Sequence, residues 1–237
     1  MKRLLLILLM CVCFILVNSC AYNMRVAKSL HDVKKTIMKI EVWVIVDNCN
    51  PGLKSCENQD QALYASGTGS VIKYKNEKII LTAQHVCYSA GVDAYAASYG
   101  ASVVIKAVDR ANKMYTARII KENISIDTCL LRVVENKIQA PALAISTKGP
   151  EYGERVFNLA APLGVINREM VPLFEGHFFG TVDNRQFYSL PSIGGTSGSP
   201  IVNSDGELIG MVQSVHSLFH HISVSPSYEE LWNFLNN

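Results

Sequence analysis

The sequence predicts an all-β protein built from many short strands. Runs rich in β-branched residues alternate with turn residues, whereas helix-forming patterns are scarce. The chain has 237 residues, of which 49% are hydrophobic, which is enough to bury one large core or two modest ones. Many short strands with few helices favour a sandwich or a barrel. The expected strands are residues 42–46, 69–72, 78–81, 102–105, 130–134, 207–212 and 222–224.

The first residues have the pattern of a signal peptide. A basic start at residues 1–3 (Met-Lys-Arg) precedes an unbroken apolar run from Leu4 to Val17, and small or polar residues follow at 18–21. The apolar run is shorter than the about 20 residues that a membrane-spanning helix needs. We therefore expect residues 1–20 to direct export.

Cys20 adds a more specific expectation about the anchor. Residues 16–20 (Leu-Val-Asn-Ser-Cys) resemble a bacterial lipobox, in which the cysteine carries lipid and becomes the first residue of the mature protein. This pattern predicts a protein of the cell envelope that is attached to a membrane through Cys20. Cleavage near Ser19 or Ala21 would instead leave a periplasmic or secreted protein, and an uncleaved anchor is the remaining alternative.

A helical lead-in is expected over residues 21–38. Its amphipathic part covers residues 25–38, and Lys34, Lys35 and Lys39 are expected on a solvated face. The charge of the remaining chain is balanced, because the full chain has 22 Lys and Arg against 20 Asp and Glu, and the signal peptide removes two basic residues and no acid. The lysines are scattered, so a nucleic-acid partner is not expected.

A second helix is expected at the C-terminus, over residues 225–235. Ser225 is the expected N-cap, Pro226 occupies the first helical position, and acidic residues follow in the first turn. Apolar residues at helical spacing would dock this helix against a β domain.

The chain carries a serine between glycines in a motif closed by proline, Gly-Thr-Ser-Gly-Ser-Pro at residues 195–200. Such a tight turn displays a nucleophile, but a serine hydroxyl needs a base and an orienting carboxylate. His85 ends an apolar run that predicts a buried strand, and Asp127 precedes another apolar run. Ser197, His85 and Asp127 are therefore the candidate catalytic residues.

These motifs resemble those of the trypsin and chymotrypsin superfamily, and more closely its bacterial Deg-type and glutamyl-endopeptidase-like branches. Residues 81–85 resemble the family's Thr-Ala-x-His segment, and residues 127–131 its Asp-x-Ala-Leu segment. Residues 195–200 resemble its Gly-x-Ser-Gly-Gly-Pro segment. The three occur in the family's order, and the resemblance spans roughly residues 39–235.

Three positions depart from the family pattern without removing a catalytic group. Gln84 replaces a small or polar residue, Cys129 replaces alanine, and Ser199 replaces the second glycine. The α/β-hydrolases are the main rival, because their G-x-S-x-G serine precedes its acid and histidine. The histidines after Ser197 lack a convincing acidic partner, so we do not favour this alternative.

The resemblance implies two six-stranded Greek-key β-barrels with the active site in the cleft between them. Residues 39–145 would form the first barrel, with His85 and Asp127, and residues 146–237 the second, with Ser197 and the terminal helix. The resemblance implies a serine endopeptidase that forms an acyl-enzyme, with His85 as base and Asp127 as its orienting group. The N–H groups of Gly195 and Ser197 would form the oxyanion hole.

The resemblance also bears on the cysteines. A triad brings His85 and Asp127 together, and Cys87 and Cys129 each lie two residues further on, so we expect a Cys87–Cys129 disulfide; two buried free thiols are the alternative. Cys49 and Cys56 bracket a short segment with proline and glycine, and a local disulfide is expected there. No paired C-x-x-C spacing appears, so neither a metal nor any cofactor is expected.

The specificity pocket is implied only by the resemblance. Its floor would lie near Pro191, where no aspartate is present to attract arginine or lysine, so a small or apolar substrate side chain is expected. The walls would include Ser192, Gln213, Ser214, Val215 and His220. Family members that cut after glutamate use a serine and a histidine, and Ser192 with His216, His220 or His221 is the alternative arrangement.

The expected partners are peptide or protein substrates. Membrane contact is expected only through the N-terminal signal or lipid, and the protein is expected to be a monomer because no additional peptide-binding domain follows the terminal helix. The rival function is a catalytically inactive module of the same fold that holds peptides at the cell envelope.

Overall fold

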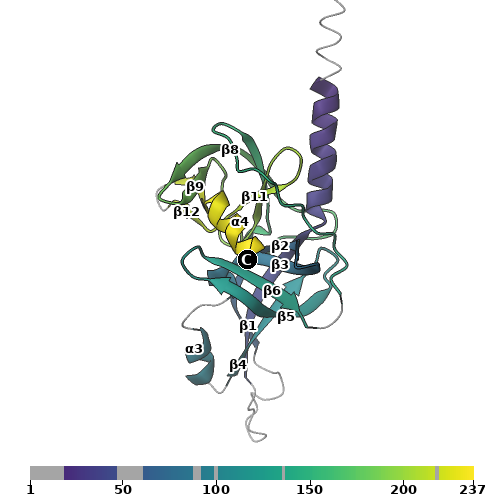
Figure 1. The fold of residues 1–237 in the computed structure, drawn as a ribbon. Coiled ribbons are helices and arrows are strands. Elements are labelled where there is room, and N and C mark those ends of the chain that lie inside the picture. Colours follow the sequence, from purple (N-terminus) through teal and green to yellow (C-terminus); the bar gives the residue numbers. More distant parts are fainter. Residues whose placement is uncertain (1–18, 47–60, 88–91, 99–100, 135–136, 217–218) are drawn as a thin grey trace, which may run out of the picture.

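A computed structural model describes residues 19–46, 61–87, 92–98, 101–134, 137–216 and 219–237. The expected Cys49–Cys56 disulfide and most of the signal peptide lie outside these residues. Figure 1 shows two β units in contact, with a long helix along one side and a short C-terminal helix close to both units.

The first unit is a closed antiparallel barrel with strand order β1-β2-β3-β6-β5-β4. Its hairpin between β2 and β3 turns at Lys75 and Asn76, which both have positive φ, as a two-residue turn between twisted strands requires. The strands are β1 (Ile37–Val46), β2 (Gln61–Tyr74), β3 (Glu77–Ala83), β4 (Ala101–Val108), β5 (Met114–Asn123) and β6 (Thr128–Val133).

The second unit is a seven-stranded sheet with order β11-β10-β7-β8-β9-β13-β12. Only Val212 and Gln213 separate β11 from β12, so the chain itself joins the two edges of the sheet. Counted as one bent strand, β11 and β12 give the six strands that the resemblance implies. The strands are β7 (Arg155–Leu159), β8 (Leu173–Val182), β9 (Arg185–Tyr188), β10 (Pro200–Val202), β11 (Leu208–Met211), β12 (Ser214–His216) and β13 (Phe219–Pro226).

The chain passes from the first unit to the second within a few residues. Leu143 bridges to Ile72 of β2, and Ile145 bridges to Leu208 of β11. Further elements are an N-terminal helix over residues 19–34, α2 (Gln84–Cys87), α3 (Val92–Ser98), the 3₁₀ turn η2 (Pro162–Gly164) and α4 (Tyr228–Asn236).

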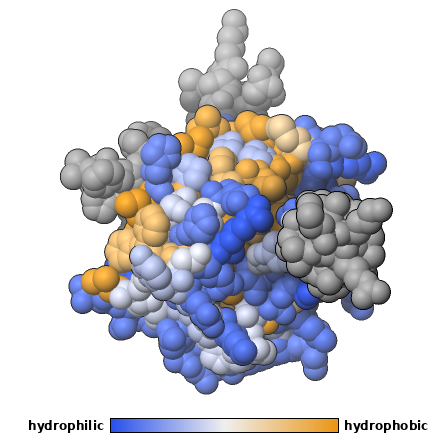
Figure 2. All heavy atoms as spheres, turned by 90° about the horizontal axis from the view of Figure 1, so that it is seen from above, coloured by the Kyte–Doolittle hydropathy of each residue, from blue (hydrophilic) through white to orange (hydrophobic). Residues whose placement is uncertain are grey.

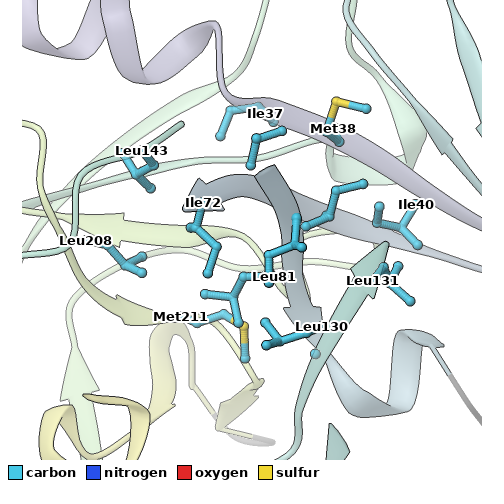
Figure 3. Close-up of a cluster of buried hydrophobic side chains, with 14 of the residues drawn as sticks. Ile37, Met38, Ile40, Ile72, Leu81, Leu130, Leu131, Leu143, Leu208 and Met211 are labelled. Atoms are coloured by element: carbon cyan, nitrogen blue, oxygen red, sulfur yellow. The ribbon is translucent and has the colours of Figure 1, made fainter. Parts of the chain in front are cut away.

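One hydrophobic core crosses the boundary between the two units. It joins Ile37, Leu81 and Leu130 of the first barrel to Leu208 and Met211 of the second sheet, as Figure 3 shows. The N-terminal helix contributes Val26, Leu30 and Val33, and α4 contributes Leu231, Phe234 and Leu235. A second hydrophobic cluster, which includes Phe178, Tyr188 and Leu190, forms a separate core within the second unit. The units are therefore packed as one body around their shared face.

The N-terminal helix ends earlier than expected, at residue 34 and not at residue 38. It covers residues 19–34, because β1 begins at Ile37 and pairs with both β2 and β4. Lys39 lies on this strand, where it pairs with Glu41 at 2.7 Å, and so does not belong to a helical face as predicted. The helix docks on the second sheet through Arg25 and Asp205, which are 2.8 Å apart.

The C-terminal helix also begins later than predicted. Ser227, and not Ser225, is the N-cap, and its hydroxyl accepts a hydrogen bond from the Glu230 N–H at 3.2 Å. The reason is that β13 continues through Pro226, which pairs with Arg185. Ser225 therefore lies on the strand, where its hydroxyl accepts from the Met211 N–H.

The surface above the second sheet is mixed in character. β8, at the top of Figure 1, exposes the apolar residues Leu173, Phe179 and Val182. Figure 2 views this side and shows apolar patches interleaved with hydrophilic residues. Among the described residues, the helices are all too short or too polar to cross a membrane.

Candidate active site

His85 follows directly on the buried strand β3. Leu81 to Ala83 are buried, and the chain then turns into α2, whose second residue is His85. The Thr82 hydroxyl donates to the Thr68 carbonyl at 2.7 Å and ties the end of β3 to β2. Strand and turn together place the imidazole at the rim of the first barrel, as the apolar run predicted.

Asp127 lies in the turn between β5 and β6. Its backbone is in the left-handed region with φ of 45°, which is uncommon for any residue except glycine, asparagine and aspartate. The turn is fixed by the Asp127 N–H donating to the Ile124 carbonyl and by the Gln84 N–H donating to the Asp127 carbonyl at 3.1 Å. The second bond connects the aspartate turn directly to α2.

His85 and Asp127 make two hydrogen bonds to each other. His85 Nδ1 is 2.8 Å from Asp127 Oδ2, and the His85 backbone N–H donates to Oδ1 at 2.8 Å. An ionised carboxylate only accepts, so Nδ1 carries the proton and Nε2 is left as the basic nitrogen. The His85 side chain is 50% exposed and that of Asp127 is 25% exposed. The imidazole is thus oriented by a largely covered carboxylate and stays accessible from solvent.

The predicted disulfide between Cys87 and Cys129 is present. Their Cα atoms are 6.6 Å apart, and both residues are buried. Cys129 pairs with Thr82 across the β3–β6 ladder, next to the strand ends that carry His85 and Asp127. The disulfide therefore braces the two segments that hold the histidine and the aspartate.

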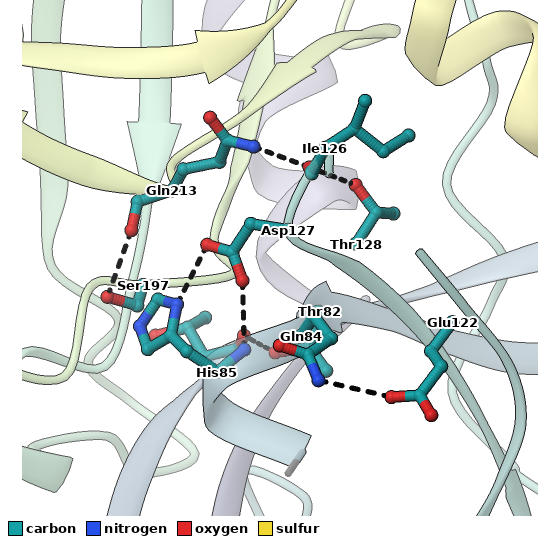
Figure 4. A network of polar contacts seen from close by, with 10 residues as sticks. Thr82, Gln84, His85, Glu122, Ile126, Asp127, Thr128, Ser197 and Gln213 are labelled. Carbon is teal, nitrogen blue, oxygen red and sulfur yellow. Dashed lines mark hydrogen bonds and ion pairs between the residues drawn. The ribbon is translucent and has the colours of Figure 1, made fainter. Parts of the chain in front are cut away.

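Ser197 lies in the loop between β9 and β10, which we name the serine loop (residues 191–199). Gly195 and Gly198 have φ of 92° and 83°, a conformation that favours glycine. The Ser197 hydroxyl donates to the Gln213 carbonyl at 3.5 Å, a long contact. Figure 4 shows Ser197, His85 and Asp127 gathered at one place from the two units.

Thr68 of β2 holds the serine loop against the first barrel. Its N–H donates to the Ser197 carbonyl at 2.8 Å, and its hydroxyl donates to the Gly195 carbonyl at 2.7 Å. The same hydroxyl accepts from the Ala161 N–H at 2.9 Å. One residue thus connects the first barrel, the serine loop and the segment after β7.

The N–H groups of Gly195 and Ser197 remain available. In the part of the chain that the structure describes, no backbone or side-chain acceptor within the protein takes a hydrogen bond from either of them. Two free N–H groups separated by one residue, next to a serine hydroxyl, match the requirement for binding a developing oxyanion.

All three candidate catalytic residues line one cleft of about 600 Å³. Of the predicted pocket residues, Ser192, Gln213 and Ser214 line it too, whereas Pro191 is not among its lining residues. The other lining residues are Ile193 and Gly194. Val215 and His220 lie on β12 and β13, and their side chains are outside the described part of the structure, as is that of His216.

Gln213 has a further contact that sequence reasoning missed. Its side-chain amide donates to the carbonyl of Ile126, the residue before Asp127. The contact runs from the second sheet to the turn that holds Asp127. It therefore connects Gln213, whose carbonyl accepts from Ser197, with the turn that positions His85. Because it depends on a meeting of chain segments 87 residues apart, no local pattern signals it.

Among the described residues, no group of three or more His, Cys, Asp or Glu side chains lies close enough together to hold a metal ion.

The chain belongs to the trypsin-like peptidase domain family, whose profile matches residues 67–211, more than half of the sequence. This match covers the segments of His85, Asp127 and Ser197. No curated protein sequence matches the chain.

Solved structures show the same fold at low sequence identity. A serine endoprotease from Yersinia pestis is 16% identical with a TM-score of 0.65; the alignment covers 88% of this chain and 64% of that protein. The active form of the Rv3671c protease from M. tuberculosis is 16% identical with a TM-score of 0.63, covering 87% of this chain and 82% of that one. These structures confirm the predicted chymotrypsin-like fold. The chain spans less than two thirds of the length of the Yersinia protein.

Proposed function

We propose that the protein is an exported serine endopeptidase that hydrolyses peptide bonds in peptides or proteins. The observation that carries the proposal is the His85–Asp127 pair, at 2.8 Å between Nδ1 and Oδ2, in the same cleft as Ser197. Membership of the family indicates the class of reaction. In the cleft, Ser197 would be the nucleophile and His85 the base, and the free N–H groups of Gly195 and Ser197 lie beside them.

The proposed mechanism assigns one role to each side chain. The Ser197 hydroxyl turns from the Gln213 carbonyl toward His85 Nε2, which takes its proton as the oxygen attacks the peptide carbonyl. Asp127 holds the imidazole tautomer and stabilises the imidazolium. His85 then gives the proton to the leaving amine, and water releases the acyl group from Ser197 by the same route.

The serine loop supplies the electrostatic part of the mechanism. The N–H groups of Gly195 and Ser197 would donate to the oxyanion of the tetrahedral intermediate, and one such donor is worth about 10²- to 10³-fold in rate. Both groups belong to a loop held in place by Thr68. They would therefore require little reorganisation during the reaction.

The cleft favours an uncharged substrate side chain next to the cut bond. Apart from His85 and Asp127, its lining residues are uncharged: Ser192, Ile193, Gly194, Ser197, Gln213 and Ser214. The Ser192 hydroxyl is already paired with that of Thr196, which leaves it less free to bind a carboxylate. We expect a peptide library to be cut after small or apolar residues; cutting mainly after arginine or glutamate would contradict this pocket.

A fluorophosphonate probe, which reacts with activated serines, tests the proposed site. We expect the folded protein to be labelled and the Ser197→Ala and His85→Ala variants to lose labelling, because both the nucleophile and its base are required. Ser199→Ala, in the same loop, is the control, and we expect it to keep labelling. The outcome is measured by mass spectrometry of the modified peptide.

A peptide-binding module without activity is the second candidate. It is favoured by one observation, that the Ser197 hydroxyl faces the Gln213 carbonyl at 3.5 Å in this structure. A folded protein that binds peptides but is not labelled by the probe would support this candidate and contradict the endopeptidase.

We propose further that the protein is exported and carries lipid on Cys20. Support comes from the signal-like sequence of residues 1–20 and from the exposed position of Cys20. The Cys87–Cys129 disulfide also suits an oxidising compartment. In a bacterial host we expect radioactive palmitate to label the parent and not Cys20→Ser. Equal labelling of both would refute the anchor.

A further inference from the structure

The 3₁₀ turn η2 lies against the serine loop through a backbone contact. The Leu163 N–H donates to the Gly194 carbonyl at 2.8 Å. The approach is close, because a Cβ placed on Gly195 would lie 2.7 Å from the Leu163 nitrogen and 2.8 Å from the Ala161 oxygen. Position 195 therefore needs glycine for space as well as for its positive φ.

This bond fixes one of the two candidate oxyanion donors. The Gly194 carbonyl and the Gly195 N–H belong to the same planar trans peptide, so they point in opposite directions. When Leu163 holds the carbonyl on its side, the Gly195 N–H must face away from η2. It then has no acceptor among the described residues, as an oxyanion donor requires.

The second donor is held in a different way. The Thr196 carbonyl, which shares a peptide with the Ser197 N–H, accepts from the Ser199 N–H at 3.0 Å. This contact is local to the serine loop, whereas that of Gly194 comes from a segment 31 residues earlier in the chain. The two halves of the oxyanion site therefore depend on separate supports.

Leu163 is held in an unusual conformation to make this contact. Its φ of 52° and ψ of 25° lie in the left-handed region, which is rare for leucine. Its side chain is 76% exposed, so burial does not explain the conformation. The turn is closed instead by the Gly164 N–H donating to Ala161 and the Val165 N–H donating to Pro162, each at 2.9 Å. Strained residues of this kind are concentrated at functional sites.

We propose that Leu163 is a positioning residue whose backbone N–H keeps the Gly194–Gly195 peptide in the orientation that offers the Gly195 N–H to the oxyanion. The inference rests on the proposed endopeptidase function. If η2 withdraws, the peptide is free to turn over, and one of the two donors is lost while Ser197 and His85 stay in place.

The test removes the single N–H group. Leucic acid, incorporated at position 163, replaces the amide with an ester and keeps the leucine side chain. We expect kcat to fall by about tenfold or more, up to the about 10³-fold that a lost oxyanion donor costs. KM should stay roughly unchanged, because the ground-state carbonyl gains little from this donor. Inhibition by a peptide aldehyde, which forms an oxyanion on Ser197, should weaken in parallel with kcat.

Two matched variants separate the contact from other effects. A hydroxy-acid replacement at Val165 removes a neighbouring bond of the same turn that does not reach the serine loop, and kcat should fall far less. Leu163→Gly keeps the N–H and suits the positive φ, so its kcat should be much closer to that of the parent than the ester's. Thermal unfolding and near-ultraviolet circular dichroism establish that each variant is folded.

A nuclear magnetic resonance measurement decides the inference independently of catalysis. With ¹⁵N-glycine labelling, the Gly195 amide resonance should shift or split in the Leu163 ester and not in the Val165 ester. Three outcomes would each overturn the proposal. They are an unchanged Gly195 resonance, equal losses of kcat in the Leu163 and Val165 esters, and a loss of kcat in Leu163→Gly as large as that in the Leu163 ester. An inactive parent would refute the proposed function, while the Gly195 resonance would still decide whether Leu163 sets this peptide.

Discussion

Gly198, the residue after the candidate nucleophile, has no room for a side chain. Its φ is 83°, and an added Cβ would lie 2.2 Å from both the Thr68 carbonyl and the Thr82 hydroxyl. We expect Gly198→Ala to combine the cost of a left-handed alanine, about 1–2 kcal/mol, with an overpacking cost of about 1–3 kcal/mol. Because the displaced groups position the serine loop, probe labelling of Ser197 should be lost as well.

Gly153 provides the matched control for this prediction. Its φ is 79°, but an added Cβ would meet nothing within 4 Å. Gly153→Ala should therefore show only the backbone cost, about 1–2 kcal/mol, and keep labelling. Chemical denaturation compares the two free energies of unfolding, and equal losses in the two variants would show that crowding at Gly198 is unimportant.

For individual residues, the sequence predicted the candidate catalytic side chains well and the backbone contacts poorly. His85 and Asp127 could be located because each lies beside an apolar run that forms a strand. The Cys87–Cys129 disulfide followed from the contact between His85 and Asp127 that the resemblance implies. Thr68 and Leu163 could not, because their roles depend on hydrogen bonds to distant carbonyls. The Thr68 hydroxyl, for example, meets a carbonyl 127 residues away.

Among the elements, α2 and β6 carry the disulfide that braces the histidine and aspartate segments. Cys87 and Cys129 are separated by 42 residues, a loop for which removing a disulfide costs about 3–4 kcal/mol. For a protein of this size, that corresponds to a fall in Tm of about 10 °C. We expect the Cys87→Ala, Cys129→Ala double variant to show this fall in thermal unfolding.

The double variant should also be labelled more slowly by the probe. The two His85–Asp127 hydrogen bonds remain, so activity should be reduced and not abolished. A reducing agent applied to the parent should reproduce both effects and leave the double variant unchanged. A double variant with the Tm and labelling rate of the parent would show that the disulfide does not brace the site.

Element type was easier to predict from the sequence than element bounds. β-branched runs located the centres of β1 to β4, β6, β11 and β13. By contrast, the expected strands left out β5, β7, β8, β9, β10 and β12. All of these except β5 and β8 are only three to five residues long. In β5 (MYTARIIKEN) and β8 (LFEGHFFGTV), charged residues or glycines interrupt the alternation. Their stability comes from pairing with neighbours: β5 pairs with both β4 and β6. The starts of β1 and α4 were likewise set by strand pairing and not by local propensity.

For the molecule as a whole, Tyr188 predicts how stability responds to alkaline pH. Its ring lies fully buried in the core of the second sheet, and this burial raises the pKa of its hydroxyl well above the usual value. A raised folded-state pKa contributes stability that is present below the unfolded pKa of about 10 and is lost as the pH rises above it. Stability should therefore fall steeply above about pH 10.

Tyr188→Phe separates this effect from general alkaline unfolding. At neutral pH the variant loses the hydrogen bond from the Tyr188 hydroxyl to Gln186, at a cost of about 1–3 kcal/mol for the buried acceptor left behind. Above about pH 10, its stability should fall less steeply than that of the parent. Denaturation curves between pH 7 and 11 give both slopes, and identical slopes would refute the assignment to Tyr188.

The architecture of one closed barrel and one half-barrel could not be reached from strand patterns alone. Short strands favour sandwiches and barrels equally, and only the resemblance carried by three short motifs selected between them. The second unit is a half-barrel, a seven-stranded sheet whose edge strands β11 and β12 are linked in the chain by Val212 and Gln213. This link has no sequence signal, because it depends on the chain bending from one sheet edge to the other.

The Thr68 contacts have a consequence for how the proposed activity would be lost. Because Thr68 of the first barrel holds two carbonyls of the serine loop, we expect the packing of the two units and the shape of the serine loop to be coupled. If the two units separate at their shared face, the serine loop should lose the shape that exposes Ser197 to His85. We therefore expect the proposed activity to be lost before either unit unfolds. Activity assays should then detect the separation of the two units earlier than spectroscopic measurements of unfolding do.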